Sequence, residues 1–218
     1  MNLVLIGGGY LSLEIFTYIF DIEKLKKKKN LQKVFVVDKI SKKKNFFKLI
    51  NKNIIFVKSI NDIPRNLEIK ANITFGDPSL REKNFKLLKK RKIDLFSIIH
   101  PSSYVAETSR IKEGVTIAPK VVLSPFSVVE DNVLVNSGTN VGHHAKIGQN
   151  SVLSPHSIVS GNVKIGKGSF LGSNSCVLPN IKMGNYTKLS SGSVLSKNAK
   201  DFSLAHGNPA QVSKIYEY

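Results

Sequence analysis

Aliphatic residues recur at every sixth position through the second half of the chain. The series starts at Ile99 and runs unbroken to Leu195, and all seventeen members are aliphatic or methionine. The residue four places after each member is small or β-branched, from Ser103 to Ala199. No helical repeat has this period, whereas one short strand and one corner fill six residues. The pattern predicts a parallel β-helix of about six coils over residues 99–200, in which three units close each coil and coils stack about 4.8 Å apart.

The first 98 residues have a different pattern, in which short apolar runs alternate with helical periodicity. A run that ends before Gly7-Gly8-Gly9 is followed by apolar residues with helical spacing, and a second helix is expected from Pro78 to about Lys92 with Asp77 as its N-cap. Strands are expected at the apolar runs 2–6, 34–37, 54–57, 69–75 and 93–99. Alternating strands and helices predict a Rossmann-like α/β domain with a parallel sheet over residues 1–98. Residues 201–218 remain as a C-terminal tail.

Composition narrows the class of protein. The chain has 218 residues, 41% of them hydrophobic, which is typical of a globular protein. A single cysteine, Cys176, excludes an internal disulfide. No apolar run approaches the 18 residues of a spanning helix, and the first residues lack the basic leader of a signal peptide. We expect a cytoplasmic protein without a membrane partner.

The charge is strongly positive and unevenly distributed. The formal net charge is +18. Residues 1–98 have 22 Lys and Arg against 9 Asp and Glu, a balance of +13, and residues 99–218 have 11 against 6, a balance of +5. The lysine runs lack interleaved aromatic residues that stack on bases, so we favour a solvated surface over a nucleic-acid interface. A positive field also attracts small substrates that contain phosphate.

Several segments together resemble the hexapeptide-repeat acetyltransferases of bacteria. They are VLIGGGYLSLEI, TFGDPSLRE, IIHPSS, VNSGTNVGHHAKIG, GNVKIGKGSFLGSNSCVLPN and GNPAQV. Within that family the chain looks most like the sugar-nucleotide N-acetyltransferases that act on 4-amino sugars, and it is also similar to the NeuD-type sialic acid O-acetyltransferases. The resemblance implies that the β-helix is left-handed and that the protein is a homotrimer.

The resemblance also implies the reaction, which is acetyl transfer from acetyl-CoA to a sugar amine. The family's general base is the histidine after VNSGTNVG, which is His143 here. Gly161 follows one coil later, so no side chain should stand beside the imidazole, and its N–H is suited to an oxyanion. Relatives have an acidic residue after the base, but this chain has His144. His144 or Asn136 is therefore expected to orient or assist His143.

The same resemblance assigns the substrate sites. Acetyl-CoA is expected to contact Asn136, Gly161, Gly172 and Ser173, and its phosphates to meet lysines among Lys164, Lys167, Lys182 and Lys188. The N-terminal domain is expected to hold a UDP-, dTDP- or GDP-linked sugar. The loop after the first strand can present backbone N–H groups to a diphosphate. The predicted sugar-nucleotide contacts are Gly7, Gly8, Gly9, Asp38, Gly76 and Arg81.

Three other interpretations remain open at the level of sequence. O-acetylation of sialic acid is the alternative reaction. A zinc site would need three converging histidines, and the spacing of His143, His144 and His156 does not suit one, so no metal is expected. The interpretation of the prism as a nucleic-acid-binding protein rests on the positive charge alone. We expect His100 to be a structural or surface residue and His206 to pack the tail or to be solvated, and the role of His156 stays open.

Overall fold

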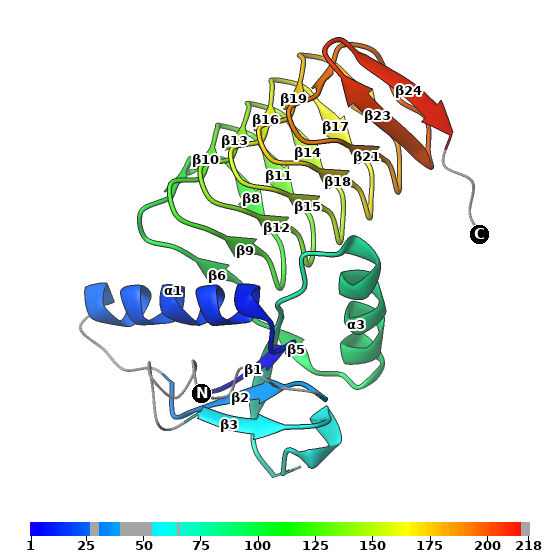
Figure 1. The fold of residues 1–218 in the computed structure, drawn as a ribbon. Helices are drawn as coiled ribbons and strands as arrows, with labels where there is room; N and C mark the ends of the chain where they lie inside the picture. The colour runs from blue at the N-terminus through cyan, green and yellow to red at the C-terminus, as the bar shows by residue number, and fades with distance from the viewer. Residues whose placement is uncertain (27–30, 40–53, 65, 215–218) are drawn as a thin grey trace.

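The computed structural model describes residues 1–26, 31–39, 54–64 and 66–214. The described residues before residue 98 form a parallel sheet flanked by helices (Figure 1). Its strands lie in the order β3-β2-β1-β4-β5, all parallel, as expected of a Rossmann-like domain. The elements are β1 (Asn2–Ile6), α1 (Tyr10–Lys26), β2 (Lys33–Val37), β3 (Ile54–Val57), the 3-10 helix η1 (Ile60–Asp62), β4 (Ile69–Ile73), α3 (Pro78–Lys90) and β5 (Asp94–Leu95). Asp77 caps α3 as predicted, because its carboxylate accepts from the Leu80 N–H at 2.9 Å.

Residues 98–195 form a parallel β-helix, which confirms the main prediction from the six-residue spacing. Each strand pairs in parallel with the strand three places later, so the strands stack into three flat faces. The strands are β6 (Ile98–Ile99), β7 (Tyr104–Val105), β8 (Arg110–Ile111), β9 (Thr116–Ile117), β10 (Val122–Leu123), β11 (Val128–Val129), β12 (Leu134–Val135), β13 (Asn140–Val141), β14 (Lys146–Ile147), β15 (Val152–Leu153), β16 (Ile158–Val159), β17 (Lys164–Ile165), β18 (Phe170–Leu171), β19 (Cys176–Val177), β20 (Lys182–Met183), β21 (Lys188–Leu189) and β22 (Val194–Leu195).

The three faces and three corners of this prism are named here by their strands. The first face contains β6, β9, β12, β15, β18 and β21, the second contains β7, β10, β13, β16, β19 and β22, and the third contains β8, β11, β14, β17 and β20. The first corner joins the first and second faces, the second corner joins the second and third, and the third corner joins the third and first. The second corner therefore lies opposite the first face.

The stack is longer on one face than the expected six coils. The first face has eight strands, because the tail adds β23 (Ser203–Gly207) and β24 (Ala210–Lys214) beyond the last hexad. β23 pairs in parallel with β21, and β24 returns antiparallel to β23. The hexad count missed this extension because the tail has no six-residue period, yet its backbone satisfies the open edge of the last coil.

The aliphatic positions fill the interior of the prism. From Ile117 to Leu195 every member of the sixfold series is buried. Ile99 is 38% exposed because it belongs to the first coil, which has no coil beneath it. The outward positions differ between faces: the second face presents apolar side chains such as Tyr104 and Ile158, and the third presents Lys146, Lys164 and Lys182.

A left-handed residue stands at every corner of the prism from residue 114 to residue 192. The fourth residue of each hexad from Gly114 to Gly192 has φ between 52° and 70°. Asparagine and glycine, which tolerate this conformation, fill nine of these fourteen positions. Phe126, His144 and His156 are among the exceptions. Side chains other than Asn or Gly are therefore accommodated here at some conformational cost.

The N-terminal domain covers the first face of the prism. Outward side chains of that face, including Ile98, Leu134 and Val152, are buried. α3 lies along the third corner, where Arg81 bonds to Asn132, and α1 reaches the first corner, where Asp21 meets His100. The second corner, on the opposite side of the prism, is left facing away from the domain of its own chain.

Candidate active site

A cavity of about 560 Å³ lies at the carboxyl ends of the strands of the N-terminal sheet. It is lined by Gly7, Gly8 and Gly9 after β1, by Asp38 after β2 and by residues of α3. A side chain at Gly8 would collide with Asp38, because its Cβ would lie 2.3 Å from Oδ2. The glycine therefore allows the loop and the carboxylate to approach closely. This edge of a parallel sheet is where doubly wound domains bind ligands.

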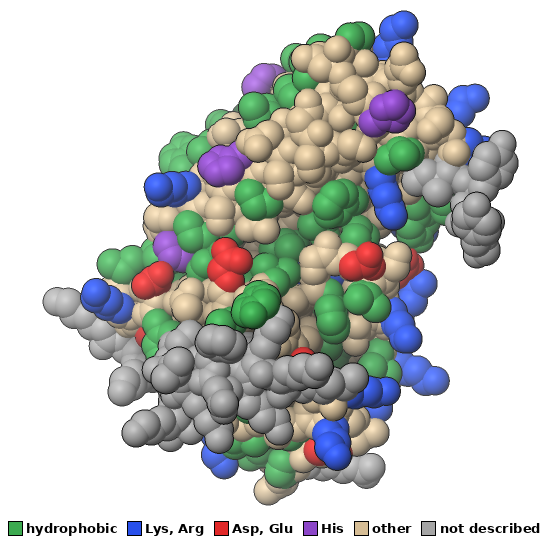
Figure 2. Space-filling view, viewed as in Figure 1, with side chains coloured by type: hydrophobic (Ala, Val, Ile, Leu, Met, Phe, Trp, Pro, Cys, Tyr) green, Lys and Arg blue, Asp and Glu red, His purple; other side chains and the backbone are tan. Residues whose placement is uncertain are grey.

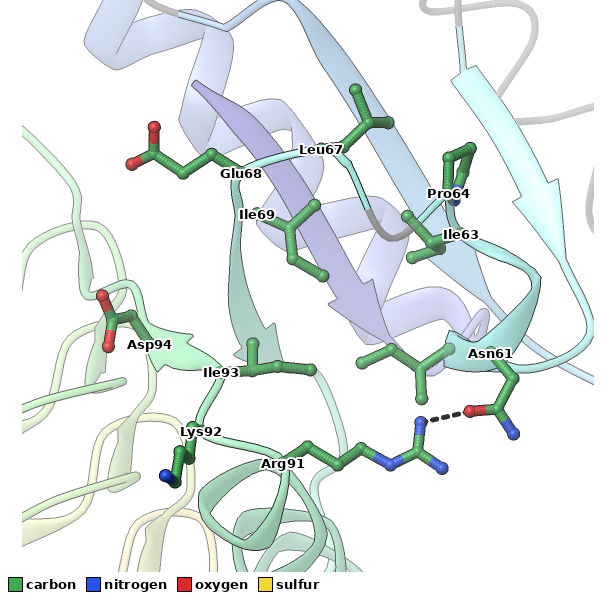
Figure 3. A pocket seen from close by; sticks show the side chains of 11 residues that line it. Asn61, Ile63, Pro64, Leu67, Glu68, Ile69, Arg91, Lys92, Ile93 and Asp94 are labelled. Carbon is green, nitrogen blue, oxygen red and sulfur yellow. Dashed lines mark hydrogen bonds between the residues drawn. The ribbon is translucent and has the colours of Figure 1, made fainter.

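Cations that sequence reasoning did not single out also line this cavity. They are Lys39, Lys58 and Arg91. Arg91 also lines a second cavity of about 600 Å³ at the outer edge of the domain, where its Nη1 donates to Asn61 Oδ1 at 2.6 Å (Figure 3). The lysines follow strand ends, which is the signal that would have identified them. Together with the glycine loop they make the first cavity suited to a diphosphate.

The prediction that Arg81 binds a sugar nucleotide is wrong. Arg81 is fully buried and points into the domain junction. Its guanidinium donates to the Ile73 and Phe75 carbonyls at 2.7 and 3.0 Å and to Asn132 O at 2.8 Å. Burial lowers the pKa of Arg81 to about 9, so the group is still charged near neutral pH. Gly76, in the same segment, lies outside the residues that line the cavity.

His143 lies at the second corner of the prism, between β13 and β14, and is exposed. The ring edge that contains Cε1 and Nε2 lies over Gly161, where an added Cβ would be 2.6 Å from both atoms. The absent side chain of Gly161 thus makes room for the imidazole itself. As expected, no side chain of residue 161 stands beside the imidazole, but the ring itself occupies the space over the glycine.

The backbone N–H of Gly161, at the second corner, differs from two N–H groups at the third corner of the prism. At the same hexad position, the N–H groups of Glu113 and Lys167 are capped by an acceptor side chain one coil later, Asp131 at 3.2 Å and Asn185 at 3.0 Å. One coil after Gly161 stands Pro179, which offers no side-chain acceptor. Within the described part of the chain this N–H has no hydrogen-bond acceptor.

His144 is the residue that contacts the imidazole of His143. The two Nδ1 atoms are 3.2 Å apart, and the rings meet edge to face at 84°. His144 also stacks on Phe126, with ring centroids 5.0 Å apart. Sequence reasoning missed Phe126, although it precedes His144 by 18 residues and therefore lies one coil below it.

Asn136 does not meet His143 within one chain. Asn136 lies at the first corner, before β13, and His143 follows β13 at the second corner. Its Oδ1 accepts from the Ser137 N–H at 2.8 Å. The expectation that Asn136 orients His143 is therefore wrong for residues of the same chain, and His144 is left as the contacting partner.

Gly172 and Ser173 share the first corner with Asn136. A Cβ on Gly172 would lie 2.4 Å from the Ser191 nitrogen, so this glycine lets consecutive coils pack closely. The Ser173 carbonyl accepts from Gly192 at 2.9 Å. The predicted acetyl-CoA residues thus divide between two corners, with Gly161 at the second and the others at the first.

The candidate phosphate-binding lysines are also separated. Lys164 and Lys182 are exposed neighbours on the third face, next to the second corner. Lys188 belongs to the first face, and Lys167 lies over the Tyr186 ring at the third corner, 5.4 Å from its centroid. Of the four candidate lysines, Lys164 and Lys182 are the two that lie near the corner of His143.

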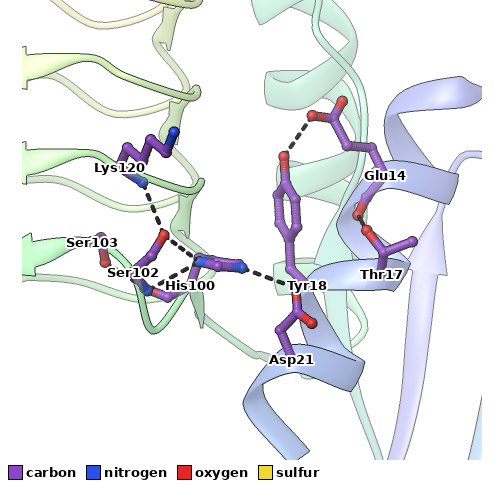
Figure 4. A network of polar contacts seen from close by, with 8 residues as sticks. All are labelled: Glu14, Thr17, Tyr18, Asp21, His100, Ser102, Ser103 and Lys120. Atoms are coloured by element: carbon purple, nitrogen blue, oxygen red, sulfur yellow. Dashed lines mark hydrogen bonds and ion pairs between the residues drawn. The ribbon is translucent and has the colours of Figure 1, made fainter. Parts of the chain in front are cut away.

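The remaining histidines lie elsewhere. His100 is structural as expected: the Ser102 N–H donates to its Nδ1 at 3.1 Å, so Nε2–H faces Asp21 (Figure 4). The Tyr18 ring packs against His100 in the same network, and burial with a hydrogen bond to Glu14 raises the pKa of the Tyr18 hydroxyl. His156 lies over Gly138 at the first corner, and His206 is exposed on β23.

Figure 2 shows histidine side chains at separate points of the visible surface. Among the residues that the structure describes, no three His, Cys, Asp or Glu side chains gather into a group suited to a metal ion. No described helix is both long and apolar enough to cross a membrane.

Solved structures of sugar acetyltransferases have the same fold as this chain. Perosamine N-acetyltransferase from Caulobacter crescentus, a histidine variant in complex with CoA and GDP-perosamine, is similar with a TM-score of 0.85 at 23% identity, covering 98% of this chain and 97% of that one. The acetyltransferase domain of PglB from Neisseria gonorrhoeae, in complex with acetyl coenzyme A, has a TM-score of 0.84 at 21% identity and covers 96% and 98%. WeeI from Acinetobacter baumannii has a TM-score of 0.74 at 16% identity and covers 98% and 100%.

No protein-family model matches the chain, and no curated protein sequence matches it. The structural likeness confirms, at the level of the fold, the resemblance to hexapeptide-repeat sugar N-acetyltransferases. It extends over both the sheet domain and the prism.

Proposed function

We propose that this protein is an acetyl-CoA-dependent N-acetyltransferase that acts on the amino group of a nucleotide-linked amino-dideoxysugar. The observation that carries the proposal is the exposed imidazole of His143 laid over Gly161 at a prism corner. It occurs on a fold whose solved examples hold CoA with GDP-perosamine, or acetyl coenzyme A. Acylation of an amine requires a group that removes a proton near neutral pH, and histidine is suited to this role.

His143 acts as the general base in this proposal. The sugar amine attacks the thioester carbonyl, forming the new C–N bond, while Nε2 of His143 takes one proton from the nitrogen. The C–S bond then breaks, and the imidazolium returns its proton to the departing CoA sulfur. The products are the N-acetyl sugar nucleotide and CoA, with His143 back in its neutral form.

The N–H of Gly161 is proposed as a donor to the carbonyl oxygen. Negative charge develops on that oxygen as the amine adds, and a fixed N–H group that faces it lowers the barrier. Support comes from the absence of a competing acceptor for this N–H within the described residues. Its neighbour Pro179 one coil later leaves the group uncapped.

The cavity of the N-terminal domain is proposed to hold the nucleotide diphosphate. Gly8 and Gly9 offer backbone N–H groups, whereas the Gly7 N–H donates to the Val37 carbonyl at 3.0 Å. Lys39 and Lys58 offer positive charge, and Asp38 is placed to accept from a base or ribose. The excess of +13 in residues 1–98 supports attraction of this anionic substrate.

A homotrimer is proposed because one chain leaves the site incomplete. The nucleotide cavity belongs to the domain that covers the first face, whereas His143 stands at the opposite corner. A neighbouring copy can bring its own first corner, with Asn136 and Ser173, beside His143. The apolar outer side of the second face, where Tyr104 is 60% and Ile158 is 44% exposed, supports contact with such a copy. Acetyl-CoA would lie between the copies, near Lys164 and Lys182.

A panel of UDP-, dTDP- and GDP-linked amino sugars with acetyl-CoA tests the proposal, with release of the CoA thiol as the readout. Thiol release with at least one amine and none with its N-acetylated product is expected. Release with sialic acid and with no amine would instead indicate the O-acetyltransferase. If none of the amino sugars and no sialic acid gives thiol release, both activities are overturned.

A further inference from the structure

We propose that His144 is a positioning residue that holds His143 in the tautomer able to act as a base. The two Nδ1 atoms lie 3.2 Å apart, within hydrogen-bond distance. Two neutral imidazoles make such a bond only when one Nδ1 has a proton and the other has a lone pair. Each arrangement of this pair therefore fixes the tautomers of both rings.

Only one of these arrangements leaves His143 ready to accept a proton. When Nδ1 of His143 donates to His144, Nε2 of His143 has its lone pair free. That nitrogen is on the ring edge over Gly161, where the proposed function, on which this inference rests, places the amine. In the opposite arrangement Nε2 already has a proton, and the ring cannot act as a base there. After proton transfer the bond to neutral His144 becomes charge-assisted, which stabilises the imidazolium.

The orientation of His144 is fixed by packing. Its ring stacks on Phe126 with an interplanar angle of 29°. That stack presents the edge of His144 to His143, whose ring is nearly perpendicular at 84°. Both Phe126 and His144 occupy the left-handed corner position, with φ of 62° and 58°. Two aromatic residues at a position that favours Asn or Gly therefore form one support for the imidazole of His143.

Three variants distinguish the contribution of the ring nitrogen of His144 from the contribution of its ring shape. His144→Phe keeps an aromatic ring at a position where Phe126 shows that phenylalanine fits, but it removes the acceptor. His144→Asn keeps an acceptor in its side-chain oxygen and is suited to the backbone, as Asn162 shows one coil later. His156→Phe is the matched control, because His156 has the same corner conformation, φ 59°, at a different corner.

The tautomer of His143 is the primary readout and needs no substrate. Ring-nitrogen NMR of the full chain with ¹⁵N-labelled histidine, assigned with His143→Ala, should show a proton on Nδ1 of His143. His144→Phe should lose this tautomer, whereas His144→Asn and His156→Phe should retain it. In kinetics His144→Phe should lower kcat about 10- to 100-fold with KM for acetyl-CoA within about 2-fold, and His144→Asn should recover most of kcat.

The positioning role of His144 and the proposed function are overturned by different results. A proton on Nε2 of His143 in the unmodified protein, or retention of the Nδ1–H tautomer in His144→Phe, would overturn the positioning role. Control of the tautomer by His144 in a protein that acetylates no amine would overturn the proposed function instead, and would leave the positioning of His143 supported.

Discussion

Arg81 and Asn132 bond to each other in both directions across the junction of the two domains. The guanidinium Nη2 donates to Asn132 Oδ1 at 2.9 Å, and Asn132 Nδ2 donates back to the Arg81 carbonyl at 3.1 Å. Both residues are fully buried. The contact ties α3 to the third corner of the prism, so the orientation of the N-terminal domain depends on it.

Replacement of Arg81 by alanine should destabilise the protein severely. The Ile73, Phe75 and Asn132 oxygens would lose a buried donor, and unsatisfied buried groups cost about 1–3 kcal/mol each. We expect the free energy of unfolding in denaturant to fall by about 3 kcal/mol or more. Lys89 lies on the same helix as Arg81 and makes an exposed ion pair with Glu113 of the prism, so Lys89→Ala should change the free energy of unfolding by less than about 1 kcal/mol. Equal effects of the two variants would contradict the structural role of Arg81.

His143→Ala should lower kcat at least about 100-fold, since it removes the group that is proposed to take the proton from the amine. The measurement is thiol release at saturating acetyl-CoA and sugar nucleotide. Sedimentation of the variant should match the unmodified protein. Turnover near the normal rate would remove His143 as the base.

Gly161→Ala should act through His143. The new Cβ would lie 2.6 Å from Cε1 and Nε2, so the ring must move from its place. We expect a loss of kcat comparable to that of His143→Ala. In the double variant the second substitution should add little, because the two changes remove the same interaction. Additive losses would show that the new methyl group acts independently of the imidazole.

Two neighbouring glycines of the first loop should differ in their tolerance. A Cβ at Gly8 would be 2.3 Å from Asp38 Oδ2, whereas a Cβ at Gly9 would have no atom within 4 Å. Gly8→Ala should lower Tm and raise KM for the sugar nucleotide, because the loop and Asp38 must separate. Gly9→Ala should leave Tm unchanged. Thermal denaturation measures both Tm values. The reverse order of Tm values would contradict the close approach of Gly8 to Asp38.

The mass in solution should be three times the 24.1 kDa of one chain. Ile158→Asp on the exposed second face should dissociate the assembly and abolish acetyl transfer together, because the site would lose the neighbouring copy. Val128→Asp is the matched change on the outer side of the third face, and it should leave the trimer intact. Sedimentation equilibrium checks both, and an active monomer would refute a site shared between copies.

The six-residue spacing by itself determined the prism and its vertical neighbours. An aliphatic residue in each short strand demands a common interior, so three faces follow from the period alone. Residues 18 apart lie one coil apart, which already places Phe126 below His144 and Gly161 above His143. The alternation of apolar runs and helices likewise determined a parallel sheet before residue 98.

Side-chain direction and domain packing were decided only by the tertiary structure. By its sequence alone, Arg81 is a cation near the start of a helix. In the structure it is buried at the domain junction, because the carbonyls there need a hydrogen-bond donor. His143 fills the space over Gly161, and Asn136 faces a different corner, because strand β13 separates the two corners. The burial of Arg81 depends on which face the N-terminal domain covers, a long-range contact that no local period encodes.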